Sequence, residues 1–294
     1  MNKIILLPII AGSAIFVAAS VLFSICAINS SKANANVTKT VEVEAYNKLD
    51  IKINTADIEF KVSEDGTRKV VLEEREKLYH TVEVSNNTLS IKSVDARKWY
   101  EHLSFSFSPM KVTIYAPKEA YETSSIEAST GNITIPNDYS FSDLNVKVST
   151  GDVSVKSEVI NTLNVESSTG NISLEMNAKS INASASTGHV NLNKVNTSED
   201  IKISVSTGHV NLKDTIAKKN LKINTSTGDV KFDDSDAHSI DVETSTGDVT
   251  GTLLTAKLFD CQSNTGDVRV PAPSGDSPCK IRTSTGNIIL SVKA

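Results

Sequence analysis

The side chains with the clearest potential for chemistry stand at one position of an internal repeat. The tripeptide Ser-Thr-Gly, once Asn-Thr-Gly, is followed by Asn, Asp or His and then by Val or Ile. The repeat glycines are residues 131, 151, 170, 188, 208, 228, 247, 266 and 286. The residue after the glycine is His189 and His209 in two neighbouring repeats, and Asp229, Asp248 and Asp267 in three consecutive ones. If the repeats stack, each set forms a row of side chains about one strand spacing apart.

Either row could bind a cation, but each is short of ligands. Two imidazoles about 5 Å apart could hold Zn²⁺ or Cu²⁺, or repel each other when protonated, yet their column offers no third ligand. Three carboxylates in a row repel unless a cation or hydrogen-bond donors compensate. Calcium needs about six to eight oxygen ligands, and one carboxylate per repeat falls short. We therefore expect no metal or cofactor, and solvated side chains that bond local turn amides.

Cys261 and Cys279 are the only cysteines beyond the apolar N-terminal segment, and two thiols do not make a disulfide framework. Both fall in inward columns of neighbouring repeats but are offset by two residues. In-register stacking places their Cα atoms about 8 Å apart, beyond the usual disulfide limit of about 7 Å. The insertion at residues 271–278 could shift that register. Free buried thiols are favoured, and a disulfide is the alternative.

The repeat also predicts the elements that position these side chains. Val, Ile and Leu predominate seven and five residues before each glycine and two and four residues after it. Alternation on both sides of a glycine corner predicts two short strands per repeat, each with one buried face. Such strands bury that face only by stacking. We predict an all-β fold in which residues 118–294 form a parallel β-solenoid (β-helix) of nine or more coils of 18–20 residues.

Residues 37–117 are less regular. Residues 49–58 look like a degenerate repeat with Ala56 in place of the glycine. Alternating runs follow between turn signals, at residues 69–72, 81–84, 89–93 and 104–107. We predict an irregular, β-rich N-terminal cap, antiparallel in part, that covers the first layer of the solenoid.

Residues 1–36 carry the targeting signals. Residues 4–28 form an almost uninterrupted apolar run after Lys3, long enough to span a membrane. We expect a retained anchor and a short spacer, which makes the protein a single-pass cell-membrane protein with its C-terminal domain outside. The alternative is a secreted protein whose signal peptide is cleaved near Ala35, within a small-x-small pattern.

Composition and spacing argue against two function classes. Once Lys3 and Lys32 are set aside, residues 37–294 carry 28 basic and 35 acidic groups, which is no footprint for nucleic acid. Coils this short leave no room for the grooves of glycan-cleaving β-helices, which need paired acids. The sequence also has no Ser/His/Asp order and no phosphate loop. We therefore predict that the protein is not an enzyme.

The nine repeats, together with the segments Lys111–Pro117 and Ile126–Ile133, resemble the bacterial β-strand-repeat family of "putative adhesins" of unknown function. That resemblance covers about residues 41–294. It implies export, frequent membrane tethering and, in some members, genes in envelope-stress operons. It implies no catalytic residues.

We expect a binding or scaffolding module at the cell envelope whose partner is an envelope protein or a glycan. One reading is an envelope-stress accessory protein acting near its own membrane, and the alternative is an adhesin for external glycans or proteins. A spacer of only about eight residues, 29–36, favours the first. The coil of Gly286 has no evident cap, so we expect its edge to be covered by Lys293 and the C-terminus or by self-association.

Overall fold

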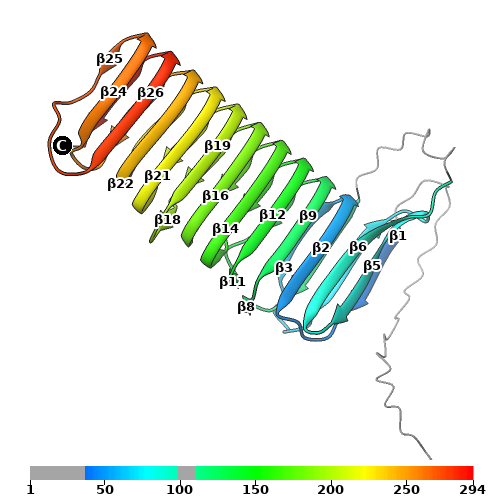
Figure 1. Cartoon of the computed structure of the whole chain (residues 1–294). Coiled ribbons are helices and arrows are strands. Elements are labelled where there is room, and N and C mark those ends of the chain that lie inside the picture. The colour runs from blue at the N-terminus through cyan, green and yellow to red at the C-terminus, as the bar shows by residue number, and fades with distance from the viewer. Residues whose placement is uncertain (1–36, 99–109, 294) are drawn as a thin grey trace, which may run out of the picture.

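The computed structural model describes residues 37–98 and 110–293, and every regular element in these ranges is a β-strand (Figure 1). Strands that precede the repeat glycines form one sheet, the pre-glycine sheet, and strands that follow them form the other, the post-glycine sheet. No helix in the described residues is long and apolar enough to cross a membrane. The predicted anchor at residues 4–28, the cleavage site near Ala35 and the predicted strand at 104–107 lie outside those residues.

The pre-glycine sheet has one long spatial order. Its strands are β5 (Leu78–Ser85), β6 (Thr88–Asp95), β2 (Lys48–Thr55), β9 (Ser124–Thr130), β12 (Leu144–Thr150), β14 (Glu158–Thr169), β16 (Asn177–Thr187), β19 (Ile201–Thr207), β21 (Ile216–Thr227), β22 (Val230–Thr246), β26 (Pro278–Thr285) and β24 (Leu258–Thr265). Three short strands extend this sheet, namely β8 (Ala120–Tyr121), β11 (Ser140–Phe141) and β18 (Asn196–Thr197).

The post-glycine sheet runs alongside it. Its strands are, in spatial order, β1 (Val37–Glu42), β4 (Lys69–Glu74), β7 (Lys111–Ala116), β3 (Asp57–Val62), β10 (Ile133–Ile135), β13 (Val153–Val155), β15 (Ile172–Leu174), β17 (Val190–Asn193), β20 (Val210–Lys213), the first part of β22, β23 (Val249–Leu253), β27 (Ile288–Val292) and β25 (Val268–Arg269). Only the pairs that involve β1, β4 and β5 are antiparallel. The predicted parallel β-solenoid with a β-rich N-terminal cap is therefore confirmed.

The core is a narrow stack of aliphatic side chains between the two sheets. Equivalent residues of successive coils lie in register, as Ile181, Ile201 and Leu221 do, and all three are buried. Each fully buried side chain of this kind contributes about 1.5–3 kcal/mol. Because every coil adds the same layer, a modest hydrophobic fraction is enough to stabilise a long rod.

Chain order and spatial order differ at both ends of the rod. At the N-terminal end, the β2–β3 coil lies between β6–β7 and β9–β10. At the other end, β26–β27 lies between β22–β23 and β24–β25, so the red strand β26 sits inside the orange strand β24 in Figure 1. The prediction that the Gly286 coil ends the solenoid was wrong, because β24 lies two strand positions beyond β22 and the chain then returns as β26 to fill the position between them.

Lys293 does not cover the free edge, contrary to the sequence-based expectation. Its backbone N–H donates to Leu253 O and its ammonium pairs with Asp234, both on neighbouring inner strands.

A buried ion pair lies at the point where the terminal coils change order. Lys257 Nζ lies 2.5 Å from Asp236 Oδ1 and donates to Ala237 O at 2.6 Å. An ion pair out of water is sensitive to the exact arrangement around it, so this contact favours one order of the terminal coils.

Candidate functional site

The repeat glycines form a corner at which no side chain fits. All nine have φ between +135° and +152°, a region that L-residues with a Cβ avoid. At Gly208 a Cβ would stand 1.9 Å from the carbonyl oxygen of Gly188 in the coil below, and the other eight corners are alike. The glycine is therefore required by the close approach of one coil to the next.

The residues after the glycines form a continuous hydrogen-bonded column, the corner ladder. In each coil the backbone N–H of this residue donates to the side chain of its counterpart in the preceding coil, as Asp152 N–H does to Asn132 Oδ1 at 2.8 Å. The ladder consists, in spatial order, of Asp57, Asn132, Asp152, Asn171, His189, His209, Asp229, Asp248, Asn287 and Asp267. Asn, Asp and His share an acceptor atom at the δ1 position, which explains why these three residue types recur.

His189 and His209 belong to this ladder. The N–H of His209 donates to His189 Nδ1 and the N–H of Asp229 donates to His209 Nδ1, both at 3.0 Å. The rings are stacked, with centroids 5.0 Å apart and planes 6° apart. Because both Nδ1 atoms accept hydrogen bonds, the ring protons lie on Nε2, and parallel rings do not aim these atoms at one point. Among the described residues no group of three His, Cys, Asp or Glu side chains could hold a metal ion.

Asp229, Asp248 and Asp267 do not form the predicted row of three. Asn287 lies between Asp248 and Asp267, because the Gly286 coil is inserted there. Asn287 N–H donates to Asp248 Oδ1 at 2.6 Å, and Asp267 N–H donates to Asn287 Oδ1 at 2.9 Å. The amides that these side chains bond belong to the next coil rather than to the local turn. Hydrogen-bond donors thus offset the charge of the carboxylates.

Cys261 and Cys279 lie on adjacent strands and are both free. Cys261 stands opposite Ile281 and Cys279 opposite Phe259, so the two are offset by two residues, as the sequence predicts. The Cys279 thiol hydrogen-bonds the sulfur of Cys261, which lowers the pKa of Cys261. The same hydrogen bond and burial raise the pKa of Cys279. The pair sits at the interior of the last two coils, away from the corner ladder.

The outer face of the pre-glycine sheet carries a trough that sequence reasoning missed. It has a volume of about 710 Å³ and crosses β16, β19, β21, β22, β26 and β24. One wall is the column of residues two before the glycines, which is serine in five of these coils and Asn264 in the last. The other wall includes Lys222, Glu243, Gln262 and Arg282. The outward serines were visible in the sequence, but the hollow that they line was not.

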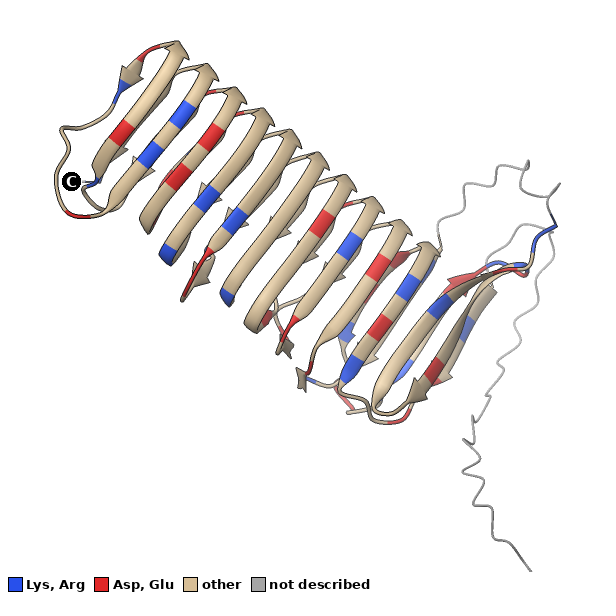
Figure 2. Ribbon diagram, viewed as in Figure 1, with Lys and Arg blue, Asp and Glu red and all other residues tan. Residues whose placement is uncertain are grey.

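On this outer face, basic and acidic strands alternate along β21, β22, β26 and β24 (Figure 2). Lys222 pairs with Asp241 at 3.2 Å and Arg282 with Asp260 at 2.5 Å. Exposed pairs of this kind contribute about 0–1 kcal/mol each. Glu243 has no ion pair among the described residues, although Arg282 stands beside it on β26. Its carboxylate is therefore available to a donor in the trough.

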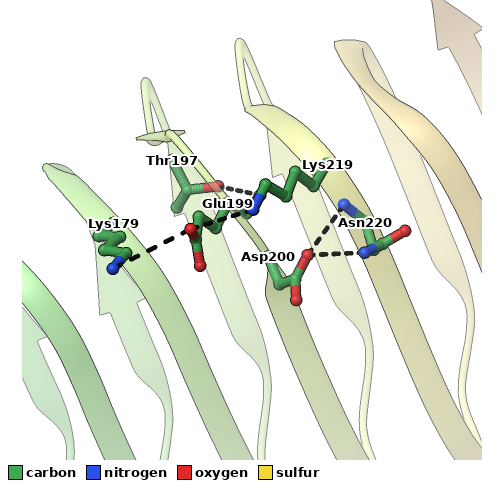
Figure 3. A network of polar contacts seen from close by, with 6 residues as sticks. All are labelled: Lys179, Thr197, Glu199, Asp200, Lys219 and Asn220. Atoms are coloured by element: carbon green, nitrogen blue, oxygen red, sulfur yellow. Dashed lines mark hydrogen bonds and ion pairs between the residues drawn. The ribbon is translucent and has the colours of Figure 1, made fainter.

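The edge opposite the glycine corner holds another polar network (Figure 3). Glu199 accepts from Lys219 Nζ at 3.0 Å and lies 4.0 Å from Lys179 Nζ. Asp200 Oδ1 accepts from the backbone N–H of Asn220 at 3.2 Å and from its Nδ2 at 2.8 Å. Each contact joins one coil to the next, so these acids hold the stack together.

Comparison with known proteins finds a matching family and several similar structures. Residues 46–179 and 175–294 match the model of the Toastrack DUF4097 family. The crystal structure of a "putative adhesin" from Bacteroides fragilis NCTC 9343 is 19% identical, with a TM-score of 0.52, and the match covers 87% of this chain and 97% of that one. A "putative lipid binding protein" from Parabacteroides distasonis ATCC 8503 is 18% identical, with a TM-score of 0.51 and the same coverage. The sequence has no significant match among curated proteins.

Proposed function

The chain belongs to the Toastrack DUF4097 family, and we propose that its solenoid is a non-enzymatic binding and scaffolding module of the bacterial cell envelope. The trough on the pre-glycine sheet carries the proposal, because it is a hollow of about 710 Å³ lined mainly by polar side chains that recur along successive coils. The names of the two similar structures, one an adhesin and one a lipid-binding protein, also denote binding.

The chemistry of the trough favours an extended, hydroxylated ligand. Serine hydroxyls both donate and accept hydrogen bonds, and here they recur once per coil along the length of the hollow. An acyl chain would need a predominantly apolar lining, which the trough does not have. We therefore assign a glycan strand of the envelope as the ligand class.

The carboxylate content of the trough supports binding without cleavage. Glycoside hydrolysis uses two carboxyl groups, about 5–10 Å apart, on either side of the scissile bond. Glu243 is the one carboxylate among the residues that line the trough. A bound glycan would thus meet an acceptor and an array of hydroxyls, but no acid–base pair.

The anchor predicted at residues 4–28 would hold this module close to the outer side of the membrane, where envelope glycans are within reach. Cleavage near Ala35 would release it instead. A tag after Ala294 used for proximity labelling in intact cells separates these cases. Labelled membrane proteins of the same cell, with the protein in the membrane pellet, support the envelope role. Protein in the medium that labels only external material supports the adhesin alternative.

Binding itself is tested with the full chain and soluble glycan strands prepared from cell-wall peptidoglycan. Ser226→Tyr fills the trough, whereas Ser149→Tyr changes the equivalent exposed serine of a coil outside it. We expect Ser226→Tyr to weaken binding by about tenfold or more, a loss of about 1.4 kcal/mol, and Ser149→Tyr to leave it unchanged. Equal affinities for the two variants, or no binding by the unaltered chain, would overturn the glycan assignment.

A further inference from the structure

The two ends of the solenoid are finished in different ways. At the N-terminal end the antiparallel strands β1, β4 and β5 close both sheets. At the other end, as far as the described residues show, the sheets stop at β24 and β25 without antiparallel strands beyond them (Figure 1). We infer that this free end, the β24–β25 coil, pairs with the same end of a second copy of the chain.

The inward side chains of the β24–β25 coil lack a covering layer. Phe259 and Cys261 are only partly buried, whereas Cys279 and Ile281, in the same columns one coil deeper, are fully buried. On the post-glycine sheet Val268 is 41% exposed, while its neighbour Ile288 is buried. One further layer of strands would remove this apolar surface from water.

The backbone of this coil is also open to pairing. Within the described residues β24 pairs only with β26, and β25 pairs only with β27. Natural edge strands are commonly protected by lysine, proline or a bulge. The sequence of β24, Leu-Phe-Asp-Cys-Gln-Ser-Asn-Thr, contains neither lysine nor proline. Its row of outward N–H and C=O groups is therefore a template for another strand.

A second copy of the same end suits this surface better than the opposite end does. At the N-terminal end the described edge strands β1 and β5 run antiparallel to their neighbours, so head-to-tail stacking on them would not continue the parallel coils. A contact between two C-terminal ends is instead two-fold and self-limiting. The charges on β25 are self-complementary. Two copies of β25 paired antiparallel about Val268 place Asp267 opposite Arg269 of the second copy. Within one molecule these two side chains pair at 2.7 Å and are well exposed, so they can exchange partners.

The contact area sets the expected strength. Stable interfaces bury about 800 Å² per partner, and the end of a coil made of two strands offers less. We therefore expect a reversible dimer whose population rises with concentration, rather than an obligate one.

Sedimentation velocity of the full chain in a mild detergent, over a range of concentrations, tests the inference. Val268→Lys places a charge on the free edge, at a residue that is 41% exposed. Ile289→Lys is the matched control, because Ile289 lies on β27 and is 42% exposed. We expect dimers for the unaltered chain and for Ile289→Lys, and monomers for Val268→Lys. Circular dichroism and thermal melting confirm that each variant is folded.

A charge exchange provides a second test. Arg269→Asp alone opposes two acids across the two-fold axis and should weaken the dimer, and the double variant Asp267→Arg, Arg269→Asp should restore it. A monomer at every concentration, or equal effects of Val268→Lys and Ile289→Lys, would overturn the inference. Ser226→Tyr should leave the dimer unchanged, so failure of the glycan assignment and failure of the dimer are separable.

Discussion

The glycine corner and the outer face of the pre-glycine sheet differ in how far the fold uses their polar side chains, and therefore in what they leave free for a function. The corner holds the histidines and aspartates that are the strongest candidates for chemistry in the sequence, yet the δ1 acceptors from Asp57 to Asn287 bond the backbone of the next coil. The outer face holds serines and scattered charges that look like ordinary surface residues, yet most of their hydrogen-bond donors and acceptors are not used by the fold. Repetition in every coil therefore does not by itself mark a binding site, and a ligand can use only the side chains that the fold leaves free.

The largest expected effect is at the corner itself. Gly208→Ala would bring a Cβ to 1.9 Å from Gly188 O, and backbone atoms on both sides cannot yield easily. We expect the free energy of unfolding to fall by more than about 4 kcal/mol, as it does when a substitution severely disrupts packing. Chemical unfolding followed by circular dichroism measures it.

Gly66→Ala is the matched control for Gly208→Ala. Gly66 also has a positive φ, +73°, but a Cβ there would meet nothing within 4 Å. We expect a loss of about 1 kcal/mol, from backbone strain alone. If the two variants unfolded at the same denaturant concentration, close approach of the coils would not be the reason for the repeat glycines.

A smaller effect is expected where the coils change order. Lys257→Met keeps the length of a side chain that is 1% exposed, but it leaves Asp236 buried without its ammonium. Breaking one side of a buried pair is expected to lower stability by about 3 kcal/mol. In the double variant Lys257→Met, Asp236→Leu no charge is left unpaired, so part of the loss should return in thermal melting. Equal stability of the single and double variants would contradict an ordering role for the pair.

The end of the rod also shows what the sequence could and could not predict. The period-two alternation around each glycine is enough to predict coils, their inward columns and a cap built around Ala56. It cannot predict coil order, because Gly266 and Gly286 carry the same motif. Either coil would place its inward residues in the same columns at either position. The order depends on contacts between distant residues, Lys257 with Asp236 among them. The corner column was visible as well, but not which backbone amide each side chain bonds.

The next effect in size separates hydrogen bonding from charge in the corner ladder. His209→Leu removes the acceptor that bonds Asp229 N–H, and the loss of one such hydrogen bond lowers stability by about 0.5–1.5 kcal/mol. His209→Asn supplies an acceptor at the same position and should retain most of the stability. Urea unfolding midpoints rank the variants. If His209→Asn were as unstable as His209→Leu, the imidazole ring itself, through its stack on His189, would be what the ladder needs.

The smallest effect on stability is expected on the outer face, and it completes the comparison. Lys147 and Glu166 pair at 2.9 Å on neighbouring strands, with both side chains more than half exposed. Lys147→Ala should therefore leave the unfolding midpoint nearly unchanged. Glu243→Gln, which removes a carboxylate with no ion pair of its own in the described chain, should be equally neutral to stability but should weaken glycan binding. A stability loss for Glu243→Gln as large as that of His209→Leu would mean that the outer face is committed to the fold like the corner, and that its trough has no capacity left for a ligand.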